Sequence, residues 1–164
     1  MKETEYNDGK HTFVNTQDMK PEEREKLAHE FCEGSIELKR LLLTLWNEGI
    51  ETCGCCTGEQ EFHKDRKFGD DETYIGMDIK DSDDRKKIYH MLIEPIRRAE
   101  YDYRIDFNNI PAELGARIEG SVSIRTKQKT EQLGIITQQD ADKFFKSLND
   151  CIEQYKTQDN GINL

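Results

Sequence analysis

The apolar residues of this chain follow two different periods, and the order of these periods constrains the fold more than any other feature of the sequence. Between Leu38 and Trp46 the apolar side chains recur every three or four positions, which predicts an amphipathic helix. Residues 73–79 alternate apolar and polar positions, which predicts a strand with one buried face. Along the whole chain the two periods predict the element order α-α-β-β-α-β-β-α.

This order predicts an α+β fold in the form of a two-layer sandwich. About four short strands would form a mostly antiparallel sheet, and the amphipathic helices would cover one of its faces. Pro95 interrupts the third helical pattern, so we expect a kink or a break there. The last helix is expected to bury the side made of Ala141, Phe144, Phe145, Leu148, Cys151, Ile152 and Tyr155.

The length of 164 residues is typical of one domain with a single core. We expect this domain to span residues 20–157. Residues 1–19 have no apolar period, and they are predicted to form an extension that becomes ordered only by docking onto something. Residues 158–164 are predicted to be a frayed tail.

Residues 49–60 read GIETCGCCTGEQ and place three of the five cysteines within four positions. One interpretation is a zinc site, because zinc prefers sulfur and nitrogen ligands. The candidate ligands are Cys53, Cys55, Cys56 and His63. The spacing C-x-C-C is shorter than the roughly two to four intervening residues usual for zinc, and neighbouring side chains on a strand point in opposite directions.

The same segment allows three other interpretations. A cysteine at a helix start would be a reactive thiol, although the acids Glu59 and Glu61 disfavour a thiolate there. A ligand-binding loop would use the close backbone approach that Gly54 and Gly58 permit. Its candidate binding residues are Thr52, Cys55, Cys56, Thr57, Gly58 and Glu59. The fourth interpretation is a tight buried turn packed with small side chains.

Two resemblances concern this segment. The pattern G-I-x-T-x-x-C-C-x-G followed by a "YI" strand is similar to one in small uncharacterised proteins of Gram-positive bacteria and their phages. The stretch TCGCCTGE also resembles the T-x-x-S-C-S-G-R motif of the wybutosine-synthesising tRNA methyltransferase family, which likewise follows an amphipathic helix. The aligned residues are Thr52, Cys55, Cys56, Thr57 and Gly58, and Glu59 stands where that family has arginine. This second resemblance implies a ligand-binding loop.

The charge of the chain is unevenly distributed around a net value of −10. Residues 59–84 hold ten acids and four bases, a local net of −6, whereas residues 85–104 hold six bases and three acids, a local net of +3. The acidic balance argues against direct binding to nucleic acid, since that requires a basic face. It suits a basic partner protein instead.

The sequence also predicts the compartment. No apolar run approaches the roughly 18 residues needed to span a membrane, and the N-terminus lacks the basic and apolar regions of a signal peptide. We therefore expect a cytoplasmic protein with reduced cysteines and no membrane partner.

These observations favour one functional hypothesis over two others. The favoured one is a non-enzymatic binding protein, encoded by a phage or mobile element. It would sequester a small ligand, or inhibit a host defence protein through its acidic surface. The first alternative is a relative of the S-adenosylmethionine-dependent tRNA-modifying enzymes. The second is a small zinc-stabilised interaction domain, in which replacing Cys55 or Cys56 by serine would melt the fold.

Overall fold

A four-stranded sheet organises the computed structural model, which describes residues 3–5, 12–14, 16–57, 73–109, 119–126 and 137–162. The strands β3 (Thr52–Cys56), β4 (Tyr74–Ile79), β5 (Tyr103–Asn109) and β6 (Gly120–Thr126) lie in the order β3-β4-β6-β5. All three strand pairs are antiparallel. The predicted α+β class and element order are confirmed.

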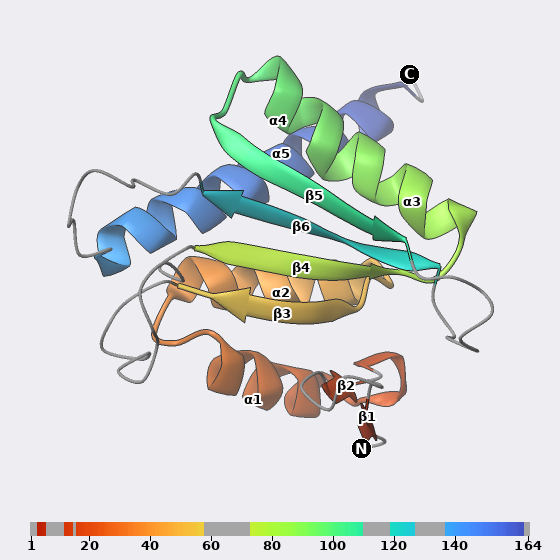
Figure 1. Ribbon diagram of the computed structural model, residues 1–164, viewed down its shortest axis with the longest axis vertical. Helices are drawn as coiled ribbons and strands as arrows, with labels where there is room; N and C mark the ends of the chain where they lie inside the picture. The colour runs from red at the N-terminus through yellow and green to blue at the C-terminus, as the bar shows by residue number, and fades with distance from the viewer. Residues whose placement is uncertain are drawn as a thin grey trace.

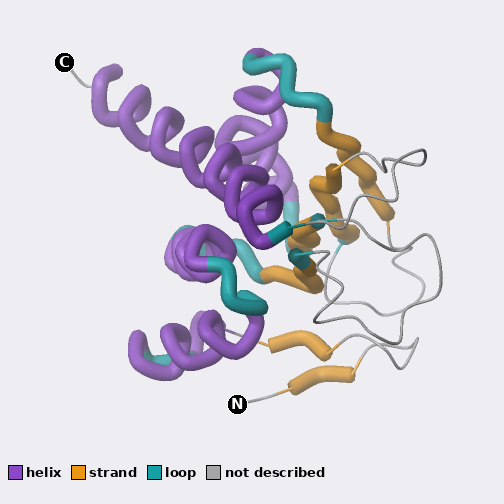
Figure 2. The backbone as a smooth tube through the Cα atoms, turned by 90° about the vertical axis from the view of Figure 1, so that its left-hand side faces the viewer, coloured by secondary structure: helices purple, strands orange, loops and turns teal. Residues whose placement is uncertain are grey.

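The long helices lie on one side of this sheet. In Figure 1, α2 (Ile36–Asn47) and α5 (Gln138–Ile162) run behind the strands, and α1 (Pro21–Phe31) lies below them. A continuous helical segment formed by α3 (Ser82–Ile88), the π-helical turn η3 (Tyr89–Ile93) and α4 (Glu94–Arg98) lies beyond β5. Figure 2, turned by 90°, shows the helices on one side and the strands of the sheet on the other, as a two-layer arrangement requires.

The core lies between the two layers and contains the side chains that the apolar periods select. The helix α2 buries its whole predicted face, from Leu38 to Trp46, with at most 1% exposure. Alternate residues of β4 and β6 meet this face, and so do the apolar positions of α5. Cys32 and Cys151 are buried among them. Phe31 is 39% exposed because it is the last residue of α1, at the corner before α2.

Three helices begin with side-chain caps that satisfy their free backbone N–H groups. The Ser35 hydroxyl accepts from Leu38 N at the start of α2, and the Asp81 carboxylate accepts from Asp84 N at the start of α3. Before α5, the Thr137 hydroxyl accepts from Asp140 N, while the Asp140 carboxylate accepts from Thr137 N. This reciprocal pair is a capping box.

Pro95 neither breaks nor sharply ends the third helical segment. The turn directly before it widens, and Glu94 N–H donates to Tyr89 O five residues earlier. Proline lacks an N–H, and its ring collides with the preceding helical turn. The π-turn η3 accommodates it, and the segment continues through α4.

Part of the predicted N-terminal extension is attached to the body of the domain. The strands β1 (Glu3–Glu5) and β2 (Thr12–Val14) pair antiparallel, and the 3-10 turn η1 (Thr16–Asp18) follows. Glu51 is buried before β3, and both of its carboxylate oxygens accept from the Thr16 hydroxyl at 2.9 Å. Glu51 Oε1 also accepts from Thr16 N at 3.1 Å. Residues 16–18 are thereby fixed onto the start of the sheet.

At the other end, α5 continues to Ile162, into the segment predicted to be a frayed tail. Its last turn contains Gly161, which costs a helix only about 1 kcal/mol relative to alanine and does not forbid it. Within the described ranges, no helix combines the length and the apolar character that crossing a membrane requires.

Candidate functional site

The cysteine segment forms strand β3, and an irregularity in that strand decides where its thiols point. The register between β3 and β4 shifts between Thr52 and Gly54, which indicates a β-bulge at Cys53. The Cys53 sulfur lies over Gly76 of β4, only 2.9 Å from the position that a Cβ atom would take there. Gly76 therefore makes room for this thiol on the face of the sheet opposite the helices.

The Cys53 thiol meets a buried acid on that face. Asp78 of β4 is 1% exposed, and its carboxylate accepts a hydrogen bond from the thiol. Its Oδ1 atom is buried and has no hydrogen-bond partner among the described residues. A buried polar atom left without a partner normally reflects strain or a functional role.

Burial dominates the ionisation of both groups. It raises the pKa of Asp78 to about 7, and the nearby charge of Glu51 adds to this effect, while the Cys53 hydrogen bond and Lys80 oppose it. Burial, followed by the charge of Asp78, raises the pKa of Cys53 to about 12. Cys53 is therefore a protonated thiol at neutral pH and a poor nucleophile.

The other described residues of the predicted ligand loop have structural partners. Thr52 Oγ1 accepts from Trp46 Nε1 at 3.2 Å, so it faces the helices. Cys55 packs against the core, and its sulfur lies 3.7 Å from Phe31 O. Thr57 is buried, and its hydroxyl donates to the Glu33 carboxylate at 2.7 Å.

The structure thus separates the two described thiols of the predicted zinc set. Cys53 and Cys55 lie on opposite faces of β3. Within the described part of the chain, no group of three His, Cys, Asp or Glu side chains could hold a metal ion. Gly58, Glu59, His63 and the side chain of Cys56 lie outside the described residues. The roles of Cys56 and His63 as zinc ligands, and of Cys56, Gly58 and Glu59 in ligand binding, therefore stay predictions.

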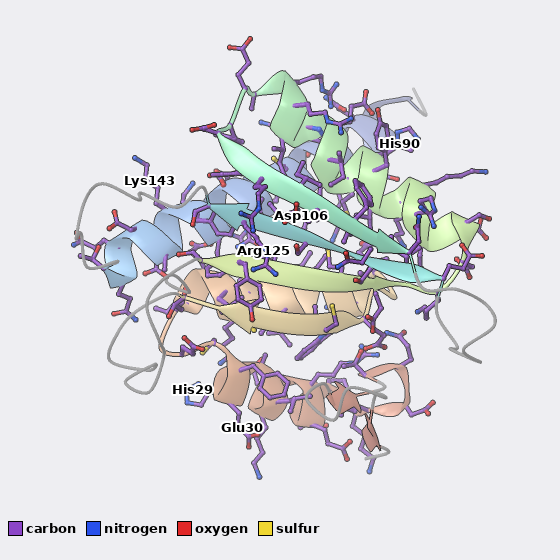
Figure 3. All side chains as sticks on the ribbon, in the orientation of Figure 1. His29, Glu30, His90, Asp106, Arg125 and Lys143 are labelled. Carbon is purple, nitrogen blue, oxygen red and sulfur yellow. The ribbon has the colours of Figure 1, made fainter. Side chains whose placement is uncertain are left out.

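The same face of the sheet carries a row of paired charges beside Asp78. Figure 3 shows Arg125 of β6 and Asp106 of β5 as neighbours on it. Arg104 Nε donates to Asp106 at 2.9 Å, and Arg125 stacks over the Tyr74 ring at 4.5 Å. These pairings neutralise most of the charge, so this face offers polar contacts rather than one sign of charge.

A groove lies between the helical segment α3–η3 and the edge strand β5. Its volume is about 460 Å³, which lies within the range of small-molecule and peptide sites. Its apolar lining comes from Ile79, Ile88 and Ile93, together with the exposed aromatic rings of Tyr89 and Phe107. Tyr89 is 41% exposed and Phe107 is 47% exposed, so the groove has aromatic walls open to solvent.

The rim of the groove is basic. Arg85, Lys86 and His90 line it, and Figure 3 shows His90 on the outer side of the helical segment. Among the described residues, Arg85 forms a long 3.7 Å ion pair with the exposed Glu119, and Lys86 forms none. His90 pairs with Glu94 at 3.1 Å. The groove therefore combines an apolar floor with a cationic entrance.

Sequence reasoning missed two features of the structure, the burial of Asp78 and the groove beside β5. Alternation along β4 placed Asp78 on an exposed face, whereas the bulged Cys53 covers it. Tyr89, His90 and Ile93 of the π-turn line the groove, and the position of Pro95 inside a helical pattern was the only signal for that turn. The net charge of +3 over residues 85–104 indicated a basic surface but not its apolar floor.

No protein-family model matches this chain, and no curated protein or solved structure matches it significantly.

Proposed function

We propose that this chain is a non-enzymatic binding protein, and that the groove between α3–η3 and β5 is its binding site. The observation that carries this proposal is the exposure of Tyr89 and Phe107 on either side of an apolar cavity of about 460 Å³. Exposed aromatic side chains grouped in a concave site are typical of ligand and partner sites. The basic rim favours an anionic occupant.

The proposal also includes an origin in a phage or mobile element and a location in the cytoplasm. The similarity of residues 49–58 to proteins of Gram-positive bacteria and their phages supports a phage or mobile-element origin. The free cysteines, Cys32, Cys53, Cys55 and Cys151, suit a reducing compartment, which supports the cytoplasm.

The groove is tested with an apolar anionic dye, 8-anilinonaphthalene-1-sulfonate, whose fluorescence rises in apolar sites. The double variant Tyr89→Ser/Phe107→Ser removes both aromatic walls, and we expect its affinity for the dye to fall about tenfold or more, because stacking and burial are lost. Fluorescence titration of the folded proteins measures this.

The matched control for the dye experiment is Phe31→Ser/Ile36→Ser. It also removes two exposed apolar side chains, 39% and 78% exposed, but from the α1–α2 corner. We expect the control to bind the dye as the wild type does. Equal binding by wild type and groove variant, or a loss confined to the corner variant, would contradict the proposed site.

A second candidate function is supported by the surface of α1. Glu22, Glu23 and Glu30 are exposed there and form no ion pair with any described residue. Figure 3 shows His29 and Glu30 on the outer side of α1, away from the sheet. Unpaired carboxylates beside the exposed apolar residues Phe31 and Ile36 suit a basic protein partner. Inhibition of a basic host protein, as in an anti-defence protein, would use this surface.

This second candidate is tested by capture of host proteins from a Gram-positive bacterial lysate at low and high salt. Neutralising α1 with Glu22→Gln/Glu23→Gln/Glu30→Gln is expected to abolish a stoichiometric complex that the wild type forms at low salt, because screening and neutralisation remove the same attraction. The control Asp83→Asn/Asp150→Asn/Glu153→Gln changes the net charge equally on α3 and α5. A complex that survives both high salt and the α1 changes would exclude this surface.

A further inference from the structure

The groove has two chemically different ends, because its helical wall changes character along its length. Arg85, Tyr89 and Ile93 are spaced by four residues, so they follow one another along one side of the helical segment. All three line the groove. At a rise of about 1.5 Å per residue, the groove runs about 12 Å from a cationic end at Arg85 to an apolar end at Ile93.

The cationic end can accept an anionic group. Arg85 and Lys86 are neighbours in α3 and both are exposed. The ion pair between Arg85 and Glu119 is long, at 3.7 Å, and joins two side chains that are 43% and 53% exposed, so an incoming anion can replace Glu119. Lys86 forms no ion pair with any described residue. A guanidinium group binds a carboxylate through two parallel hydrogen bonds, which makes Arg85 suited to that head group.

The opposite end of the groove is apolar. Ile93 is 0% exposed and Ile88 is 1% exposed, so the floor belongs to the core. Arg97 follows Ile93 by four residues but does not line the groove. The isoleucines of the floor offer no side chain that can form a hydrogen bond. A peptide or nucleotide would place polar groups there without partners, which is unfavourable, whereas a hydrocarbon chain needs none.

We propose that the groove binds a medium-chain fatty acid anion, with its carboxylate at Arg85 and Lys86 and its alkyl tail directed toward Ile93. The tail passes between the exposed rings of Tyr89 and Phe107. Carbon–carbon bonds of about 1.5 Å give an extended ten-carbon chain a length of about 11 Å, close to the roughly 12 Å between the two ends. This proposal rests on the proposed function of the groove and names the class of its ligand.

The probe is decanoate, titrated calorimetrically onto the full chain, and we expect saturable binding of one decanoate per chain. Decan-1-ol has the same tail without the charge and is expected to bind about tenfold more weakly. Octanoate and hexanoate should lose about threefold in affinity for each methylene removed. Dodecanoate and tetradecanoate should gain little over decanoate, because their tails are longer than the groove.

Neutral variants test the position of the head group. Arg85→Gln/Lys86→Gln is expected to weaken decanoate binding about tenfold and to leave decan-1-ol binding unchanged. This difference separates a lost head-group contact from a general change in the groove. Lys26→Gln/Lys143→Gln is the matched control, since it neutralises two exposed lysines on α1 and α5 and should bind decanoate like the wild type.

Nuclear Overhauser effects test the orientation of the tail. We expect the terminal methyl group of bound decanoate to lie near the δ-methyl group of Ile93. Ile79 ends β4 just before α3, so it marks the cationic end of the groove. A contact of the terminal methyl group with Ile79 in place of Ile93 would contradict the proposed orientation.

Two results would overturn the chemistry of the proposed ligand. Equal affinities for decanoate and decan-1-ol would show that no head group is recognised. An affinity that keeps rising from decanoate to tetradecanoate would show adsorption to a surface rather than binding in a groove of fixed length.

The dye experiment separates this proposal from the proposed function. Dye that binds in the groove and is not displaced by decanoate would refute the fatty acid while leaving the proposed function in place. Absence of both dye and decanoate from the groove would refute both. Self-association that Phe107→Ser abolishes, without decanoate binding, would assign the groove to a second copy of the chain.

Discussion

Replacing Glu51 with alanine is expected to lower the free energy of unfolding by about 3–4 kcal/mol, because several charge-assisted hydrogen bonds are lost and buried donors remain unpaired. Glu51 accepts from both the backbone N–H and the hydroxyl of Thr16, which is 1% exposed. Gln17 adds a bond from its side-chain amide to Trp46 O at 2.9 Å. Chemical denaturation of Glu51→Ala against the wild type measures the loss.

Two variants show whether the Glu51 effect comes from these bonds. Glu51→Gln keeps one acceptor oxygen for Thr16, so it should lose roughly half as much stability. The double variant Glu51→Ala/Thr16→Val also removes the Thr16 hydroxyl, which Glu51→Ala leaves without an acceptor. It should therefore be less destabilised than the sum of its single changes. Protection of residues 16–18 from hydrogen exchange should fall in Glu51→Ala. A variant that keeps wild-type stability and protection would show that Glu51 does not hold this segment.

Replacing Asp78 with asparagine is expected to stabilise the protein above neutral pH. Burial raises the pKa of Asp78 from 3.8 to about 7. Between these values the folded state holds a proton that the unfolded state has lost, so stability falls as the pH rises from about 4 to 7 and then levels off. At about 1.4 kcal/mol for each pH unit, ionised Asp78 costs the fold on the order of 4 kcal/mol at most.

The Asp78→Asn protein lacks this cost, so we expect it to be about 2–4 kcal/mol more stable than the wild type at pH 8 and to differ little near pH 4. Urea unfolding at a series of pH values measures the difference. Asp83→Asn, at an exposed position in the first turn of α3, is the control and should leave the pH dependence unchanged. A constant difference between Asp78→Asn and wild type at all pH values would show that Asp78 does not titrate in this range.

The fold was predictable because it depends on side-chain periods that are local in the sequence. The apolar face of α2, the alternation in β4 and the capping residues Ser35 and Asp81 all follow from spacings of two to four positions. These predictions hold in the folded protein because each period marks the residues that share one face of a helix or strand, and that face becomes buried.

The candidate site was less predictable because it depends on contacts between distant segments. Glu51 and Thr16 meet across 35 positions, and the burial of Asp78 requires a bulge at Cys53 and a glycine at position 76. The composition of the Cys-rich segment predicted a ligand or metal site there. In the structure, Thr52, Cys55 and Thr57 have partners within the fold. Periodicity carries no information about such pairings.

The π-turn before Pro95 also affects how this protein can change during evolution. A π-turn holds one residue more than an α-helical turn, so it rotates the residues before it by about 100° relative to those after it. The direction of Arg85 and Lys86 is thereby set independently of Ile96, which is buried in the core. Loss of a single codon within η3 would restore a regular helix and turn α3 relative to α4, which would move both the cationic rim and the buried Ile88. A one-residue deletion that re-aims the rim would therefore also require repacking of the core around Ile88.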